Sequence, residues 1–119
     1  MKRLEYKFES LDGYYYIDIN FDENVFVVDT SIETLESKQG TFDDEIINKL
    51  NSLKLKDWDR YYNAYGSEIT DATKWSLKYY EDDNLYETEG EESYEPYKYN
   101  DLIDLFCILD KNAKYLKFE

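Results

Sequence analysis

The chain has 119 residues, with 28 Asp and Glu against 14 Lys and Arg, and a formal net charge of −14. This length predicts a single domain spanning residues 1–119, which would bury roughly two-thirds of its unfolded surface. DNA, RNA and anionic membranes are themselves polyanions, so the charge excludes ordinary binding to any of them.

The first third of the chain alternates apolar and polar residues with the period of two that is typical of strands. Three runs show this pattern or a β-branched composition, at residues 4–8, 15–21 and 25–30. Asp12-Gly13 and residues 22–24 supply the turns between them. We expect an antiparallel meander here, with the neighbouring tyrosines 14, 15 and 16 facing opposite sides of one strand.

A change of period then predicts a helix. Residues 37–40 would form the loop before it, and Thr41 would cap it, with two aspartates in the first turn. Its apolar residues recur at helical spacing over about three turns, at Ile46, Ile47, Leu50 and Leu53. Residues 54–62 favour an extended segment.

The second half predicts a hairpin followed by a helix. Residues 63–73 read as a loop, 74–81 and 85–89 as paired strands, and 90–98 as a second loop. Asn100 would cap a helix with an apolar stripe at Leu102, Ile103, Leu105, Phe106 and Leu109. Residues 115–118 would add a last strand. The predicted fold class is α+β, with an antiparallel sheet of about five to six strands and two helices packed on it.

The most unusual segment runs from Tyr79 to Tyr97, with eight carboxylates and five tyrosines but no lysine or arginine. A block of one sign repels itself unless a cation meets it, and tyrosine provides large contact area at low entropic cost. We interpret the segment as a surface that binds a protein with a basic surface. The candidate residues are Glu81, Asp82, Asp83, Tyr86, Glu87, Glu89, Glu91, Glu92, Tyr94, Glu95 and Tyr97. The alternative is a hairpin that is merely solvated, and the binding surface would then be sought among Tyr61, Tyr62 and Tyr65.

No pattern for catalysis or for a cofactor stands out. The chain has no histidine, which removes the commonest general base, Ser-His and Cys-His nucleophile pairs, and His-ligated zinc. Alternate polar residues from Asp18 to Asn24 echo a calcium loop, but Glu23 replaces its glycine, so the polar face of a strand and turn explains them better. The single cysteine, Cys107, lies in an apolar run and is expected to be a small buried residue. No stretch reaches the length of a membrane span, and a cytoplasmic location is expected.

The C-terminal half resembles a module of small proteins from Firmicutes and their phages. The motif is a Trp-x-Leu-x-aromatic-x-acidic strand, a second strand ending in glycine, and a Tyr-Pro-x-x-aromatic-x-x-Leu sequence that opens a helix. The matching positions over residues 74–109 are Trp75, Leu77, Tyr79, Glu81, Gly90, Tyr94, Pro96, Tyr99 and Leu102, with Glu95 inserted between Tyr94 and Pro96. The resemblance implies a structural scaffold and a source.

The overall profile is also similar to that of phage anti-defence inhibitors, which are small, acidic proteins. This similarity implies a non-enzymatic inhibitor that binds a bacterial defence effector, either an NAD-depleting defence protein or a CRISPR-type nuclease. Four alternatives stay open: a strict DNA mimic, a toxin-immunity protein, a structural or assembly protein, and an enzyme that uses a pair of carboxylates.

Overall fold

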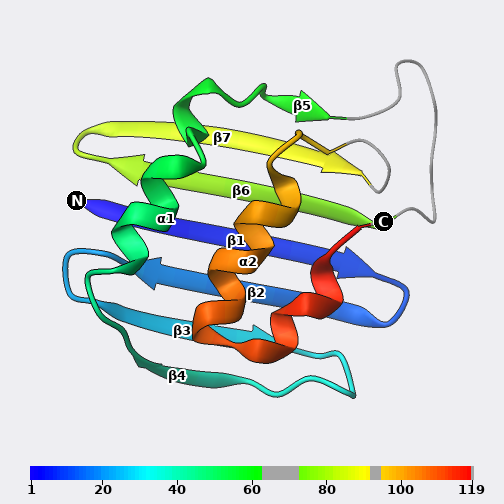
Figure 1. Ribbon diagram of the computed structural model, residues 1–119. Coiled ribbons are helices and arrows are strands. Elements are labelled where there is room, and N and C mark those ends of the chain that lie inside the picture. Colours follow the sequence, from blue (N-terminus) through cyan, green and yellow to red (C-terminus); the bar gives the residue numbers. More distant parts are fainter. Residues whose placement is uncertain (63–72, 92–94, 119) are drawn as a thin grey trace.

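The computed structural model describes residues 1–62, 73–91 and 95–118, and its architecture is α+β. One sheet forms a layer, and the helices lie across one of its faces (Figure 1). In chain order the elements are β1 (Lys2–Ser10), β2 (Gly13–Asn20), β3 (Val25–Thr30), β4 (Lys38–Thr41), α1 (Ile46–Ser52), the 3-10 segment η1 (Leu55–Asp57), β5 (Tyr61–Tyr62), β6 (Lys74–Glu81), β7 (Asn84–Glu91), α2 (Tyr99–Leu109) and the 3-10 segment η2 (Lys111–Leu116).

The sheet is larger than predicted and is mixed. Its seven strands follow the order β4-β3-β2-β1-β6-β7-β5. All neighbours are antiparallel except β5, which runs parallel to β7 at the far edge. The prediction of a purely antiparallel sheet of five to six strands was therefore wrong in this respect, because a two-residue strand such as β5 leaves no periodic pattern in a sequence.

Alternation places the core on the face that the helices cover. Tyr15 is fully buried on this face, whereas Tyr14 and Tyr16 lie on the opposite face, which we call the open face. The same alternation in β6 buries Trp75, which stacks on Tyr62 with ring centroids 6.0 Å apart. These assignments confirm the predicted strands in β1, β2, β3 and β6.

Helix α2 packs across the middle of the sheet with the predicted apolar stripe buried (Figure 1). Hydrogen bonds between buried hydroxyl groups connect this helix to the sheet. Tyr6 on β1 bonds to the hydroxyl of Tyr99 on α2, and Tyr99 in turn donates to the carbonyl of Leu116 at 3.0 Å. Three elements thereby share one polar connection inside the core.

A second buried polar group joins the helix layer to the other half of the sheet. The Asp110 carboxylate is 1% exposed and accepts a hydrogen bond of 2.8 Å from the Tyr15 hydroxyl. The amine of Lys38 on β4 lies 3.5 Å away, and the backbone N–H of Asn112 also donates to this carboxylate. The hydrogen bonds and the lysine compensate for burying the charge.

Several predicted boundaries need correction. Residues 38–41 form β4, so this segment is a strand and Thr41 caps no helix. Helix α1 starts later, at Ile46, and has seven residues. Lys98 precedes α2, and the Asn100 side chain bonds to the backbone of Phe118.

The predicted strand at 115–118 was also wrong, because that segment is part of η2 and its exit. Most of the loop predicted at 63–73 lies outside the described residues. Within the described part of the chain, no helix is long and apolar enough to cross a membrane.

Candidate functional site

The candidate binding residues lie mainly on the β6–β7 hairpin, where alternation divides them between two faces. Glu87 and Glu89 lie on the open face, opposite Lys78 and Ser76 of β6. Tyr86 pairs with the buried Tyr79 and lies on the helix-covered face, with the two ring centroids 6.2 Å apart. Tyr86 therefore supports the core and does not share a surface with the glutamates.

The remaining candidates are spread along the hairpin and beyond it. Glu91 lies at the far end of β7 on the open face, opposite Lys74. Glu95 is partly exposed, and Tyr97 is fully exposed in the segment that leads to α2. Glu92 and Tyr94 lie outside the described residues. The 79–97 segment thus does not form one continuous patch among the described residues.

Glu81, Asp82 and Asp83 lie at the tip of the hairpin. The Glu81 carboxylate accepts hydrogen bonds of 2.6 Å from both Lys56 and the Tyr79 hydroxyl. These bonds, that from Lys56 first, lower the pKa of Glu81. Asp82 adopts a left-handed backbone conformation, with φ of 55°, which aspartate tolerates better than most residues.

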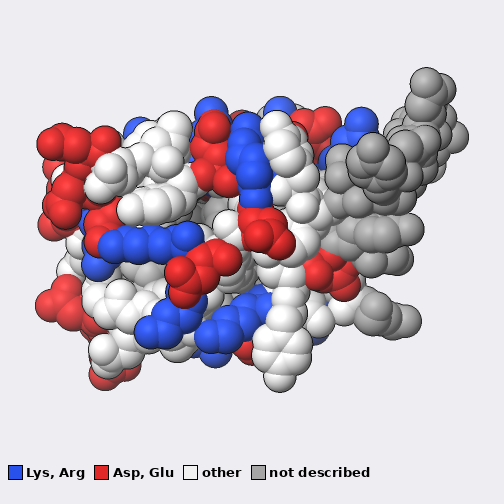
Figure 2. Space-filling model, turned by 90° about the horizontal axis from the view of Figure 1, so that it is seen from above, with Lys and Arg blue, Asp and Glu red and all other residues white. Residues whose placement is uncertain are grey.

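The structure brings this tip together with two other acidic connections that the sequence analysis did not single out. We call the group the acidic end, and it comprises the β2–β3 turn, the β4–α1 connection and the β6–β7 tip: Asp22, Glu23, Asp43, Asp44, Glu45, Asp82 and Asp83. All seven side chains are exposed. Figure 1 shows the three connections at the end of the sheet where β1 starts, and Figure 2 shows carboxylates gathered at that end.

Hydrogen bonds make the acidic end continuous. The Asn24 amide donates to Asp44 at 2.8 Å, which joins the β2–β3 turn to the β4–α1 connection. The backbone N–H of Lys2 donates to Asp22 at 3.1 Å, and the backbone N–H of Asp82 donates to the carbonyl of Met1 at 2.9 Å. The N-terminus therefore lies between the two hairpin turns.

The charge of this end is not compensated by ion pairs within the described residues. The seven ion pairs within residues 1–62, 73–91 and 95–118 involve other carboxylates, and none of them includes a member of the acidic end. The nearby cations include Lys2, whose backbone N–H donates to Asp22, and Lys56, which pairs with Glu81 next to Asp82 and whose pKa is raised first by Glu81 and in part by Asp82. Met1 is 57% exposed and offers an apolar contact in the middle of the end.

The open face has a different character around Arg3, where several of its charges are paired. Glu5 accepts hydrogen bonds from Arg3 and Tyr16 at 2.9 Å and from Tyr80 at 3.2 Å. Arg3 also makes two hydrogen bonds to Asp18, at 2.9 and 2.5 Å. Asp18, one of the residues whose spacing resembles a calcium loop, therefore forms an ion pair with Arg3. This network orders the open face and leaves less charge for a partner to satisfy.

Two groups that could act as nucleophiles, Cys107 and Tyr16, have raised pKa values. Burial raises the pKa of the Cys107 thiol on α2, and burial followed by the hydrogen bond to Glu5 raises the pKa of Tyr16. Cys107 is only partly buried, although it packs against the core. In the described ranges no three acidic or cysteine side chains come together as a metal site would require.

Comparisons with known proteins add no relative: no family model matches the chain, and neither a curated protein nor a solved structure is significantly similar to it.

Proposed function

We propose that the protein is a non-enzymatic inhibitor that binds a basic surface of a bacterial antiviral-defence effector through its acidic end. The observation that carries the binding part of this proposal is the gathering of seven exposed carboxylates, from three separate connections, without an ion pair among the described residues. Some carboxylates elsewhere in the fold, Glu5, Asp18 and Asp110 among them, are paired with lysine or arginine. Others, such as Glu33, Glu36 and Asp101, are exposed like those of the acidic end but lie outside it.

A basic partner would relieve the repulsion within this end. Complementary charge accelerates association by roughly ten- to a thousandfold, and desolvated apolar contacts slow dissociation. Met1 lies in the middle of the acidic end, and Leu85, 47% exposed, follows its β6–β7 turn. These two side chains are the apolar contacts that a partner would cover.

The turns also have a structural reason to contain Asp and Asn. Asn24 and Asp82 have φ of 56° and 55°, a conformation that these residue types favour. A positive φ does not account for Glu23, Asp43, Asp44, Glu45 or Asp83, although Asp43, Asp44 and Glu45 directly precede α1, where a helix favours negative charge. Glu23 and Asp83 have neither of these local reasons, and their presence beside the others supports a role in binding.

The class of partner rests on the profile of the chain, which is small, acidic and free of histidine. Phage anti-defence inhibitors share this profile, and so the proposed partner is a defence effector such as an NAD-depleting protein or a CRISPR-type nuclease. The expected source is a phage or mobile element.

A plating assay tests both parts of the proposal. Bacteria that express single defence systems are infected with phage, with and without the protein, and restored plating identifies the effector. The acidic-end variant combines Asp22→Asn, Asp82→Asn and Asp83→Asn, which keep the turn conformations accessible. The control variant combines Glu33→Gln, Glu36→Gln and Asp101→Asn, which are exposed residues outside the acidic end, and both variants lose three negative charges.

The proposal expects the acidic-end variant to lose restoration of plating and the control variant to retain it. Equal loss in both would show that net charge alone matters, and no restoration with any effector would contradict the proposed partner class. Strict DNA mimicry is a separate outcome, because a mimic excludes nucleic acid from the effector. A ternary complex of effector, DNA and this protein would eliminate mimicry and leave direct blockade or allostery.

A further inference from the structure

The outer edge of β4 carries backbone N–H and C=O groups that have no partner strand among the described residues. The hydrogen-bonding pattern between β3 and β4 shows which residues these are. The N–H of Phe42 donates to the carbonyl of Asn24 at 3.1 Å. Hydrogen-bonded pairs alternate in an antiparallel ladder, so Gly40 and Lys38 turn their backbone groups toward β3. Gln39 and Thr41 therefore turn their N–H and C=O groups outward, at the edge of the sheet.

This edge has little protection against pairing with another strand besides its short length of four residues. Proteins guard edges by keeping them short, or with proline, lysine or a covering segment. Here Gln39, Gly40 and Thr41 carry no charge, and the amine of Lys38 is turned toward Asp110, 3.5 Å away. β4 is the last strand on this side of the sheet in the described part of the chain. Its backbone is thus open to a further strand.

A groove with both polar and apolar lining accompanies the edge on the helix side. The groove has a volume of about 450 Å³ and is lined by β4 together with Phe42, Ile108 and Leu109. Ile108 points out of α2 and is 63% exposed. A strand added to β4 would cover part of the apolar surface that Phe42, Ile108 and Leu109 contribute to this groove.

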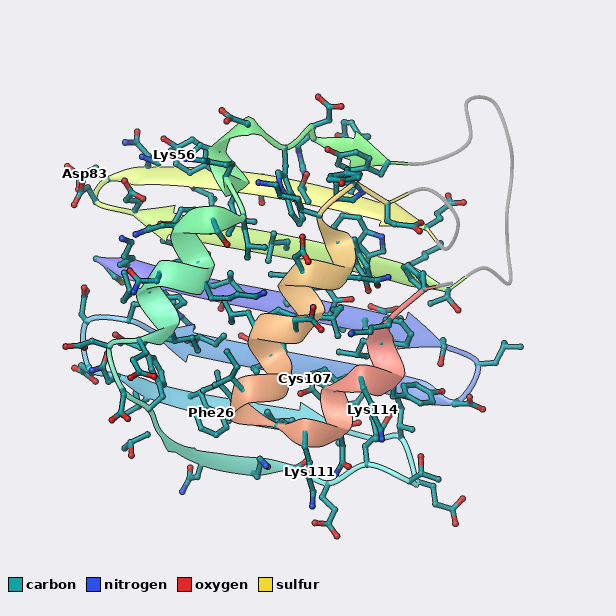
Figure 3. All side chains as sticks on the ribbon, in the orientation of Figure 1. Phe26, Lys56, Asp83, Cys107, Lys111 and Lys114 are labelled. Atoms are coloured by element: carbon teal, nitrogen blue, oxygen red, sulfur yellow. The ribbon has the colours of Figure 1, made fainter. Side chains whose placement is uncertain are left out.

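The two halves of the edge differ in charge. Asp43 and Glu45 line the groove beyond the Thr41 end of β4. At the Lys38 end, Lys111 directly follows the Asp110 that Lys38 contacts, and Figure 3 shows Lys111 reaching beyond β4. None of Asp43, Glu45 and Lys111 belongs to an ion pair among the described residues. Glu36, two residues before Lys38, weakens the positive half.

We propose that a second copy of this chain pairs with β4 in antiparallel orientation, about a two-fold axis at Gly40. In this register Gln39 of one copy and Thr41 of the other form hydrogen-bonded pairs, and Gly40 faces Gly40. The two-fold rotation places the positive half of each edge opposite the acidic half of the other. Both Ile108 side chains lie on the helix side of one continuous sheet.

The dimer is weak, because four residues and one groove bury less than a standard interface. We expect a dissociation constant on the order of 10–100 µM. Sedimentation equilibrium of the full chain, from about 5 to about 500 µM, measures it directly. The expected result is a monomer–dimer equilibrium across this range.

Two matched variants at Gln39 locate the interface. Gln39→Pro removes the outward N–H without touching the ladder to β3, whereas Gln39→Ala keeps it. Circular dichroism checks that both are folded. We expect dimerisation to weaken at least about tenfold in Gln39→Pro and to change less than about twofold in Gln39→Ala.

Two further experiments test the dimer without a proline substitution. One reverses charges across the interface, and the other measures amide hydrogen exchange. Lys111→Glu should weaken the dimer, and adding Asp43→Lys should restore it. The amides of Gln39 and Thr41 should gain protection as the wild-type concentration rises. A chain that stays monomeric up to about 500 µM, or a folded Gln39→Pro variant that dimerises like the wild type, overturns the proposal.

Discussion

The buried hydroxyl chain from Tyr6 through Tyr99 to Leu116 gives a specific prediction about stability. Tyr99 donates its only hydroxyl proton to the Leu116 carbonyl at 3.0 Å, so Tyr6 must donate to Tyr99. Tyr99→Phe then leaves both the Tyr6 hydroxyl and the Leu116 carbonyl without their partner. Tyr6→Phe removes only one bond and leaves Tyr99 donating to Leu116.

These roles set the expected magnitudes. A single lost hydrogen bond costs about 1 kcal/mol, whereas each buried group left unsatisfied costs about 1–3 kcal/mol. Tyr6 and Leu116 are both 0% exposed, so water cannot replace the lost partner. We expect Tyr6→Phe to cost about 1 kcal/mol and Tyr99→Phe about 2–4 kcal/mol. The double variant removes the stranded Tyr6 hydroxyl and should be more stable than Tyr99→Phe alone.

Urea unfolding of the four proteins, followed by circular dichroism, measures these free energies in a double-mutant cycle. The slope of the unfolding free energy against urea concentration should be the same in all four proteins. An equal slope shows that each variant unfolds between the same folded and unfolded states. The reasoning is refuted if the double variant is as unstable as the sum of the single ones, or if Tyr6→Phe costs as much as Tyr99→Phe.

Three further predictions concern stability. Tyr15→Phe removes the 2.8 Å hydrogen bond to the buried Asp110 carboxylate and should cost about 1.5–3 kcal/mol in urea unfolding, and a cost near zero would contradict the role of this bond. Gly13→Ala should cost more than about 1 kcal/mol by the same measurement, because Gly13 has φ of 130° and an added Cβ would lie 2.5 Å from the Ser31 hydroxyl oxygen. Burial raises the pKa values of Tyr6, Tyr15 and Tyr99, so the folded state holds their protons more tightly, and stability should fall as pH rises above about 10. Ionisation of these tyrosines, seen by ultraviolet absorption, should coincide with unfolding, and ionisation without unfolding would contradict their burial.

The strands predicted correctly are those with one buried face. In β1, β2 and β6 every second residue is a large apolar one, so the period of two is visible in the sequence. β4 has the sequence Lys-Gln-Gly-Thr, in which no residue is large and apolar, and it is a strand because β3 offers it backbone partners. Tertiary pairing of this kind cannot be seen in local composition.

The candidate site was predicted only in part, for a related reason. A continuous run of carboxylates such as residues 79–97 is conspicuous in the sequence, but alternation in β7 sends Glu87 and Tyr86 to opposite faces. The acidic end combines turns that are some 20 or more residues apart, and only the sheet topology brings them together. Short acidic turns at Asp22 and Asp43 look like ordinary turn and helix-start signals when they are read singly.

The central claim, that the acidic end binds a basic partner, is tested most directly by an association rate. The partner is the effector that the plating assay identifies, and the rate constant is measured for the wild type, the acidic-end variant and the control variant at low salt. We predict association at least about tenfold slower for the acidic-end variant and changed less than about twofold for the control variant, since steering depends on where the charge lies. Equal association rates for the two variants would contradict the claim.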